Sequence, residues 1–389
     1  MLLYPEIHSG LRMSRRPHGG MEEKDMFSKM IGMSLVSAFL LSFCVSLSAG
    51  NDAEVEPVKF RRFFCWGCLR NEDEAKRFAE AGVTDILVNS RKQYDLAVKY
   101  GMTPHWRVFT PAGPHPQVMT PEETKYCDYI GGKDLDPKMP AAERSAILHA
   151  RRRDVQYRYG GEPVAEIDVL ASPIPCFISD EDLALTKEKL DKLMEGAPDG
   201  IAGMFLDYFG YMNHRGCYCP GCLAKYQAYL DGRKLEDTPE NRTAFYREKI
   251  VEYYEKVIAY IKSRHPDYKI TVHVYPDFRA DPLYGNRIGA DFCGQTVSWY
   301  FKFDEPKIRQ YTDYVVTRAQ DYHKGAEGIP FIGLNTNKDH SLGYKTPDEV
   351  EHDLRTILAA GGRTVMVCSG RDILAPGYFE VFRKYCGKK

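Results

Sequence analysis

From Val58 onward, short apolar or β-branched runs alternate along the chain with segments of helical periodicity. This alternation is typical of a parallel sheet whose strands are joined by crossover helices. Eight such runs occur, at residues 59–65, 84–88, 105–109, 201–206, 269–275, 296–301, 330–335 and 363–368. Because eight β/α units are the number that closes a barrel, the sequence predicts an α/β fold, a (β/α)8 TIM barrel formed by residues 58–389 as a single domain.

A doubly wound open sheet is the competing fold. It would place a glycine-rich phosphate-binding loop directly after the first strand. Residues 65–71 read CWGCLRN and contain no such loop. The closed barrel is therefore the favoured architecture.

Capping signals support the expected helices between the strands. Asn71 is followed by Glu74, and Ser179 by Asp182, in the spacing of an N-cap and its box acid. The run Thr346 to Glu349 combines an N-cap residue, a proline at the first helical position and a box acid. Each of these sites predicts the start of a helix.

Residues 110–175 interrupt the alternation. The segment is rich in proline and glycine, carries the basic run Arg151 to Arg153, and contains one expected helix at 141–157. A segment this long inside a compact domain is usually functional or forms a small subdomain. We expect a long β3α3 insertion over the barrel mouth, with its arginines either on a solvated helix face or facing an acidic substrate.

The first 50 residues have the layout of a secretory signal region, and residues 51–57 that of a linker. Residues 31–47 form an apolar run with lysines before it and small residues after it, and Met21 or Met26 is a plausible start. The run is short for a spanning helix and acidic sequence follows it, so cleavage and export to the periplasm or outside the cell are favoured over a stable membrane span. A lipid anchor at Cys44 is disfavoured because the bulky Phe43 precedes it.

The overall charge and aromatic content narrow the class of partner. The net charge is −1, so no basic field is available to hold a nucleic acid. Aromatic residues make up 12% of the chain, with 26 tyrosines, which suits stacking against sugar rings as well as ordinary packing. The composition is consistent with a carbohydrate partner.

The residues at the carboxyl ends of the expected strands form the candidate site, because barrel enzymes place their chemistry there. Asp207 closes an apolar strand, so its carboxylate must be hydrogen-bonded or face a pocket. We expect Asp207 and Asp277 to form a catalytic carboxylate pair, with Asp291, Asp304 and Asp372 as rivals for the second acid. Asp304 fits the N-cap of the helix that follows it equally well.

Aromatic and polar residues beside these acids are expected to bind substrate. His273 alternates with valines and is predicted to face inward, as a ligand contact or as a satisfied core histidine. Arg107 and Arg371 are also the arginines that would pair with Asp207 if its role were structural. Trp106, Trp299 and Tyr300 are sugar platforms or barrel packing. The complete set is Trp106, Arg107, Tyr208, His273, Tyr275, Trp299, Tyr300, Asn335 and Arg371.

A cysteine cluster follows the fourth strand. Cys217, Cys219 and Cys222 lie within six residues, a spacing that strains mutual disulfides but wraps readily around one zinc ion. The fourth ligand would be His214, Cys176 or Cys127. A structural zinc site is favoured over disulfides or free thiols, and no organic cofactor is expected.

A second cysteine pair, Cys65 and Cys68, has the spacing of a redox motif but lies in no thioredoxin-like context. The expected last strand ends at Cys368, next to the first strand in a closed barrel. The pair therefore indicates a disulfide or packing across the barrel seam.

The strand ending Leu206-Asp207-Tyr208, the aromatic turn and the Cys-x-Cys-x2-Cys run resemble exported glycoside hydrolases of TIM-barrel fold. The cysteine spacing is also similar to that of zinc-carrying β-galactosidases of this fold. Those enzymes end strands four and seven in glutamates, whereas this chain has Asp207 and Asn335 there. An aspartate on strand four is more similar to retaining α-glycosidases, in which it is the nucleophile, and the resemblance implies that role for Asp207.

The sequence thus predicts an exported glycoside hydrolase-like enzyme that cleaves a glycosidic bond. The alternative is a barrel that binds carbohydrate without catalysis.

Overall fold

The structure is a computed structural model that describes residues 58–67, 69–111, 115–148, 150–151, 175–207, 216–274, 288–298, 303–321, 323–338 and 344–387. The described residues belong to one compact unit. The expected signal region, the linker and Cys44 lie outside the described residues.

Eight parallel strands close into a barrel in chain order, with β1 paired to β8. The (β/α)8 prediction is therefore confirmed. The strands are β1 Arg62–Cys65, β2 Asp85–Val88, β3 Thr103–Phe109, β4 Gly203–Leu206, β5 Lys269–Val274, β6 Phe292–Ser298, β7 Glu327–Gly333 and β8 Thr364–Cys368.

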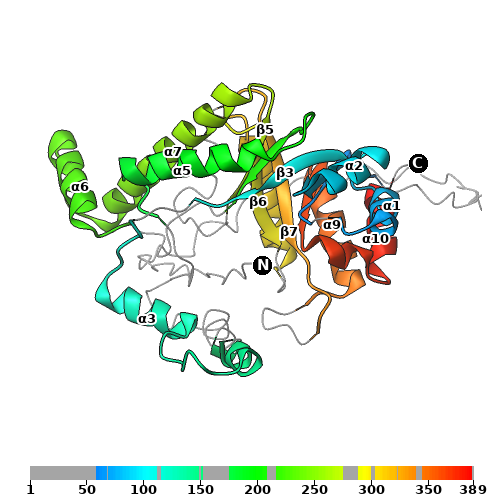
Figure 1. Cartoon of the computed structure of the whole chain (residues 1–389), viewed down its shortest axis with the longest axis horizontal. Coiled ribbons are helices and arrows are strands. Elements are labelled where there is room, and N and C mark those ends of the chain that lie inside the picture. The colour runs from blue at the N-terminus through cyan, green and yellow to red at the C-terminus, as the bar shows by residue number, and fades with distance from the viewer. Residues whose placement is uncertain are drawn as a thin grey trace, which may run out of the picture. The chain divides into compact units, whose positions relative to one another are not determined.

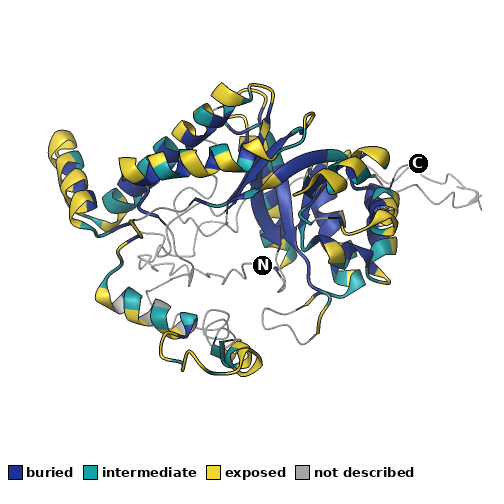
Figure 2. Ribbon diagram, in the orientation of Figure 1, coloured by how far each residue is buried: buried dark blue, intermediate teal, exposed yellow. Residues whose placement is uncertain are grey.

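Most helices pack around the barrel with their buried sides turned toward the strands, whereas the helices at 121–131 and 220–233 extend away from it (Figures 1 and 2). None of the described helices is long and apolar enough to cross a membrane. The helical elements are α1 Glu72–Glu80, α2 Arg91–Lys99, α3 Pro121–Gly131, α5 Asp180–Glu195, α6 Pro220–Arg233, α7 Pro239–Arg264, α8 Glu305–Arg318, α9 Pro347–Ala359, the short 3-10 helix η2 Gly370–Leu374, and α10 Tyr378–Cys386.

The three predicted N-caps form, but only Thr346 completes a capping box with its acid, whereas Glu74 accepts the N–H of Arg70 and Asp182 that of His115. The side chains of Asn71, Ser179 and Thr346 accept the backbone N–H three residues later, at the starts of α1, α5 and α9. Each bond satisfies an N–H that has no partner inside its helix. These helix starts are therefore encoded locally.

Strand β6 and the insertion differ most from the sequence prediction. Strand β6 begins at Phe292 rather than at 296, because the run Phe292 to Gln295 pairs with β5 although cysteine, glycine and glutamine are not strong strand formers. The insertion contains α3, which was not predicted, although Thr120 forms a complete capping box with Glu123. Of the helix predicted at 141–157, residues 141–148 and 150–151 are helical, and the rest lie outside the described residues.

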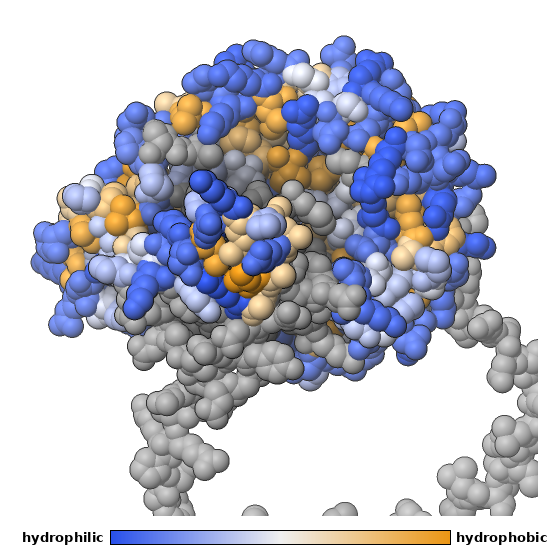
Figure 3. Space-filling view, turned by 60° about the horizontal axis from the view of Figure 1, so that its bottom comes forward, coloured by the Kyte–Doolittle hydropathy of each residue, from blue (hydrophilic) through white to orange (hydrophobic). Residues whose placement is uncertain are grey.

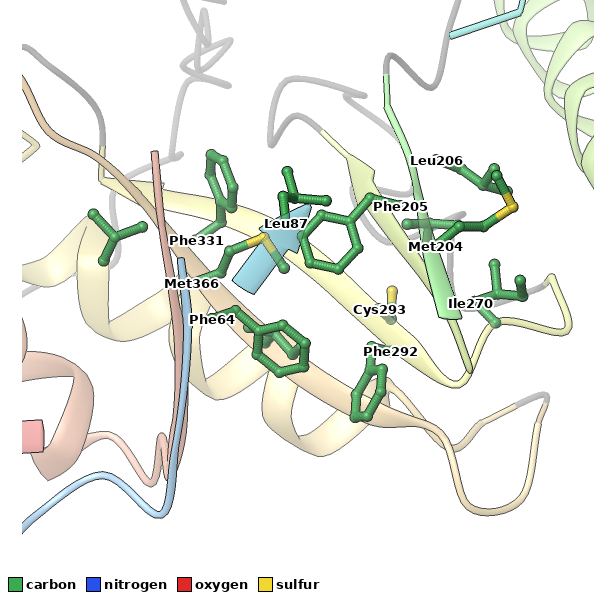
Figure 4. Close-up of a cluster of buried hydrophobic side chains, with 14 of the residues drawn as sticks. Phe64, Leu87, Met204, Phe205, Leu206, Ile270, Phe292, Cys293, Phe331 and Met366 are labelled. Carbon is green, nitrogen blue, oxygen red and sulfur yellow. The ribbon is translucent and has the colours of Figure 1, made fainter. Parts of the chain in front are cut away.

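Large side chains fill the centre of the barrel (Figure 4). Phe64 packs against Phe292 with ring centroids 5.1 Å apart and against Phe205 at 5.9 Å. Both contacts are tilted or edge-on, which is the favourable geometry for aromatic pairs. Because the interior is packed, a ligand must bind at one end of the barrel rather than in its middle.

A buried charge cluster lies near the amino ends of the strands. Asp85 accepts hydrogen bonds from Arg62 Nε and pairs with His105 Nε2, each at 2.9 Å. Burial alone would raise the pKa of Asp85, but the hydrogen bond to His105 and the charges of His105 and Arg62 outweigh it and hold the pKa below its usual value. Residues at the amino-terminal end of the strands of a TIM barrel serve stability rather than catalysis.

Candidate active site and cysteine cluster

Asp207 directly follows β4 and is only 4% exposed. Its backbone N–H donates to the carbonyl of Phe109 on the neighbouring strand at 2.9 Å. Its carboxylate Oδ1 lies 3.6 Å from Nδ1 of His273. This separation is longer than a normal hydrogen bond. A nearly buried carboxylate therefore lies at the carboxyl ends of the strands, where the sequence placed it.

His273 faces inward from β5, and both of its ring nitrogens face polar groups. Nε2 lies 2.8 Å from the hydroxyl of Thr296 on β6, and Nδ1 faces Asp207. The ring stacks on Phe331 of β7 with centroids 4.0 Å apart and planes inclined by 29°. Three strands thus fix the orientation of this imidazole beside the carboxylate.

Trp66, next to the end of β1, contributes an aromatic surface beside His273. Its ring contacts Phe205 at 5.4 Å and meets Phe331 edge-on at 5.5 Å. Trp66 is partly exposed, whereas the two phenylalanines are buried. Trp66 is not among the substrate contacts predicted from the sequence, since only the fold brings β1 opposite β5. Figure 3 shows hydrophobic surface gathered in the hollowed centre of one face, with hydrophilic side chains around it.

Trp106 and Arg107 lie on the outer side of β3. Trp106 is 1% exposed, and its indole N–H donates to the carbonyl of Leu193 in α5 at 2.7 Å. The pairing of β3 with β4 shifts register after Trp106, and Arg107 adopts a positive φ of 36°. The Arg107 guanidinium lies 4.8 Å from the Trp106 ring centroid and donates to the carbonyl of Asn89. The placement of Trp106 agrees with barrel packing, the alternative to a sugar platform.

The residues after β7 and β8 form their own hydrogen bonds. Asn335 is 8% exposed and exchanges side-chain bonds with the backbone of Asn337, each at 3.2 Å. Thr336 donates to Asp372 through its hydroxyl and its backbone N–H. Arg371 lies 3.9 Å from Glu74 of α1 and is half-exposed. Asn335 therefore reaches the strand-end region, while the ion pair of Arg371 is with a helix residue.

The rivals for the second acid have identifiable partners. Asp304 accepts the backbone N–H of Lys307 at 2.8 Å as the N-cap of α8, the alternative role predicted for it. Asp291 lies at the amino ends of β5 and β6, 2.8 Å from Lys262 and 3.0 Å from Lys269. It is wrong as a candidate second acid, because it lies at the opposite end of the barrel from Asp207.

Several predicted site residues lie outside the described residues, so the second carboxylate stays a prediction. They are Asp277, Tyr208, Tyr275, Trp299, Tyr300 and His214.

Four cysteines form a cluster outside the barrel. The sulfurs of Cys176, Cys217, Cys219 and Cys222 all lie within 4.8 Å of one another. Four thiolates around a tetrahedral zinc ion, with bonds of about 2.3 Å, would be about 3.8 Å apart. The donor set and its spacing therefore fit zinc, and Cys176 is the one of the three predicted fourth ligands that the structure brings to the cluster.

The thiols of this cluster are electrostatically coupled. Hydrogen bonds from Cys176 and Cys222 lower the pKa of Cys217 to about 2. Hydrogen bonds with Cys176 and with Cys217 raise the pKa of Cys222, and the hydrogen bond with Cys217 raises that of Cys176 to about 12. A bound divalent cation would favour ionisation of all four thiols.

Backbone hydrogen bonds connect the cysteine cluster to both ends of the insertion. Cys176 N–H donates to the carbonyl of His115 at 2.8 Å, and Tyr218 N–H to that of Val118 at 2.8 Å. The Gln117 amide donates to the Gly216 carbonyl at 2.7 Å. The cluster therefore joins the segments that precede α3, α5 and α6.

No family model matches this sequence, and no curated protein matches it. Solved structures do share its fold. The glycoside hydrolase domain of PgaB (BpsB) from Bordetella bronchiseptica has a TM-score of 0.55 at 10% identity, over 86% of this chain and 100% of that one. A polyextremophilic β-galactosidase from the Antarctic haloarchaeon Halorubrum lacusprofundi has a TM-score of 0.50 at 14% identity, over 83% of this chain and 57% of that one.

The shared feature is the fold. This chain spans less than two thirds of the length of the β-galactosidase. The first is described as a glycoside hydrolase domain and the second as a β-galactosidase, and what this chain shares with them is the barrel architecture.

Proposed function

We propose that the protein is an exported glycoside hydrolase-like enzyme whose central catalytic group is the carboxylate of Asp207. One observation carries this proposal: a carboxylate 4% exposed lies at the end of β4, 3.6 Å from a histidine that is held by two neighbouring strands. A buried carboxylate is costly unless it is stabilised. Its position at the strand ends of a barrel shared with glycoside hydrolases supports a catalytic role.

The proposed mechanism uses two carboxylates that flank the glycosidic bond. Asp207 acts as nucleophile or base, and Asp277, which follows β5, supplies the second carboxyl group. β4 and β5 are adjacent in the barrel, so residues that follow them emerge side by side. A separation of about 5 Å between the two carboxyl groups would give retention, and a clearly larger one inversion. Trp66 offers an aromatic face for a sugar ring, as sugar-binding sites commonly do.

Zinc is a second part of the proposal. Cys176, Cys217, Cys219 and Cys222 would hold one ion, and the bound ion would crosslink the loops that carry these cysteines. Four sulfur ligands make a closed site with no open position for substrate or water. The chemistry would therefore remain with the carboxylates.

Replacing Asp207 by Asn tests the catalytic assignment. We expect Asp207→Asn to lower the rate of cleavage by roughly a thousandfold or more, because loss of a catalytic nucleophile or base removes most of the rate enhancement. The measurement is cleavage of a panel of aryl glycosides and oligosaccharides, with calorimetric binding of any ligand found. Unchanged folding and ligand binding in the variant are the control, and an unchanged cleavage rate would contradict the assignment.

A barrel that binds carbohydrate without catalysis is the second candidate function. Asn335 favours it, because an amide stands at the end of the seventh strand, where the zinc-carrying β-galactosidases that the chain resembles have a glutamate. In that case the wild-type protein and Asp207→Asn would bind the same panel members and neither would cleave them.

A further inference from the structure

A buried triangle of polar side chains lies between the barrel wall and α9. Ser298 Oγ donates to Asp353 Oδ2 at 2.7 Å, and Lys345 Nζ donates to the same oxygen at 2.7 Å and also to Ser298 Oγ. Ser298 is 0% exposed, Lys345 1% and Asp353 4%. They come from the end of β6, the segment before α9, and α9 itself. One buried ion pair thus connects three elements.

Stability alone does not account for such a pair. Removing two charges from water costs free energy that their attraction often fails to recover, so well-packed apolar residues commonly serve stability equally well. What a hydrogen-bonded pair adds is a fixed geometry, since each donor must meet its acceptor at a defined distance and angle. The triangle therefore points to a requirement for precise placement of β6.

The triangle holds a register shift in β6. The pairing of β6 with β7 is regular up to Thr296 and then shifts before Ser298. In a regular strand these two residues would point to the same face. Here Thr296 faces the barrel interior and contacts His273 at 2.8 Å, while Ser298 faces α9. This local irregularity is a β-bulge, and it lets β6 contact His273 in the barrel interior and Asp353 of α9 on the outside.

The backbone of Lys345 links the triangle to β7 as well. Its N–H donates to the carbonyl of Asn335 at 3.2 Å, and its carbonyl accepts the hydroxyl of Tyr378 in α10. β7 also carries Phe331, on which His273 stacks. The two strands that orient His273 are therefore both tied to the triangle.

We propose that Ser298, Lys345 and Asp353 are positioning residues that lock the β6 bulge and thereby hold His273 beside Asp207. They act through Thr296 on β6 and Phe331 on β7 and do not touch the substrate. The catalytic consequence rests on the function proposed for Asp207. The orientation of His273 can be measured without that function.

The variant Ser298→Ala tests the proposal, because it removes the hydrogen bonds of β6 to Asp353 and Lys345 and leaves the ion pair between these two residues in place. Side-chain nitrogen NMR of histidine-labelled full-length protein reports the ring environment of His273, with the signals assigned through His273→Gln. We expect Ser298→Ala to shift the His273 signals and to lower kcat on a cleaved panel glycoside about tenfold with KM unchanged, equivalent to about 1.4 kcal/mol. Ser298→Thr keeps the hydroxyl, so its His273 signals and its kcat should equal those of the wild-type protein.

Lys262→Met is the matched control. It breaks an ion pair with Asp291, at the opposite end of the barrel, and should lower stability while leaving the His273 signals in place. Unshifted signals in Ser298→Ala, or an equal shift in Lys262→Met, would overturn the positioning role. If the wild-type protein cleaves no glycoside, the proposed enzymatic function fails, and the NMR comparison still decides the positioning role.

Discussion

Two carboxylate and histidine pairs lie at opposite ends of the same barrel, and their surroundings differ. Asp85 is 2.9 Å from His105 and 2.9 Å from Arg62, and a threonine hydroxyl donates to it at 2.7 Å. Asp207 is 3.6 Å from its histidine. Asp85 is held in a network of charged side chains at the amino ends of the strands, which serve stability. Asp207 lies at the carboxyl ends, where barrel enzymes have their active sites.

The Asp85 network predicts a pH-dependent contribution to stability. The pKa of Asp85 is lowered in the folded state, so its contribution is present above the unfolded value of about 4 and is lost as pH falls through the folded value. We expect Asp85→Asn to lower the free energy of unfolding by about 2 kcal/mol at pH 7. This difference from wild type should shrink below about pH 4. Urea denaturation at a series of pH values measures it.

The control for that series is Asp95→Asn, which removes an exposed pair with Arg91 in one helix. Such pairs contribute about 0.5 kcal/mol or less. A difference for Asp85→Asn that stayed constant down to pH 2 would contradict the linkage.

At the scale of elements, the cysteine cluster holds both ends of the long insertion close together. An isolated bridge pairs Pro116 with Pro175, close to both ends of the insertion. The cluster lies beside this bridge and also holds the start of α6, where Cys219 is the N-cap residue. Its placement ties two barrel connections together on the side of the barrel where Asp207 lies.

Removal of zinc should therefore loosen these loops without unfolding the barrel. We expect purified protein to contain about one zinc ion per chain, since four thiolates make a closed site. Cys222→Ser should lose the metal and become sensitive to proteolysis near residues 216–222, with the circular dichroism of the barrel retained. Elemental analysis and limited proteolysis measure these outcomes.

Cys293→Ala provides the comparison, because Cys293 is a buried cysteine of β6 outside the cluster. It should retain the metal. Protein without zinc and without titratable thiols at the cluster would instead support disulfides.

Elements were predictable where their signals are local. The capping box at Thr346 predicted α9, and the same signature at Thr120 marks α3, so that helix was identifiable from the sequence by the same rule. The start of β6 was harder to predict, because Gly294 has low strand propensity. A glycine fits there because a Cβ would lie 2.9 Å from the carbonyl oxygen of Val272. There the packing of neighbouring strands overrides the local preference.

At the scale of the whole molecule, the packed interior makes the barrel one cooperative structure. Phe64 is completely buried and contacts rings from β4 and β6 across the interior. Its neighbours belong to strands far apart in the sequence. The loss of one such ring should therefore affect the entire barrel.

We expect Phe64→Ala to lower the free energy of unfolding by about 3–5 kcal/mol, through lost burial and the cavity left behind. Denaturant unfolding monitored by circular dichroism measures this loss. Val98→Ala is the control, because Val98 is 51% exposed on α2 and its truncation should change stability by about 0.5 kcal/mol or less. Equal losses in both variants would contradict a packed interior at Phe64.

The sequence by itself determined the eight β/α units, most helix starts, the placement of Asp207 after β4 and three of the four clustered cysteines. These features follow from periodicity, capping and spacing, which act over a few residues. Only the tertiary structure decided that His273 lies beside Asp207, that Cys176 completes the cluster, and that Ser298 turns outward to meet Lys345. The reason is physical: these contacts join distant segments, and they depend on barrel closure and on the β6 bulge, neither of which is encoded in local propensity.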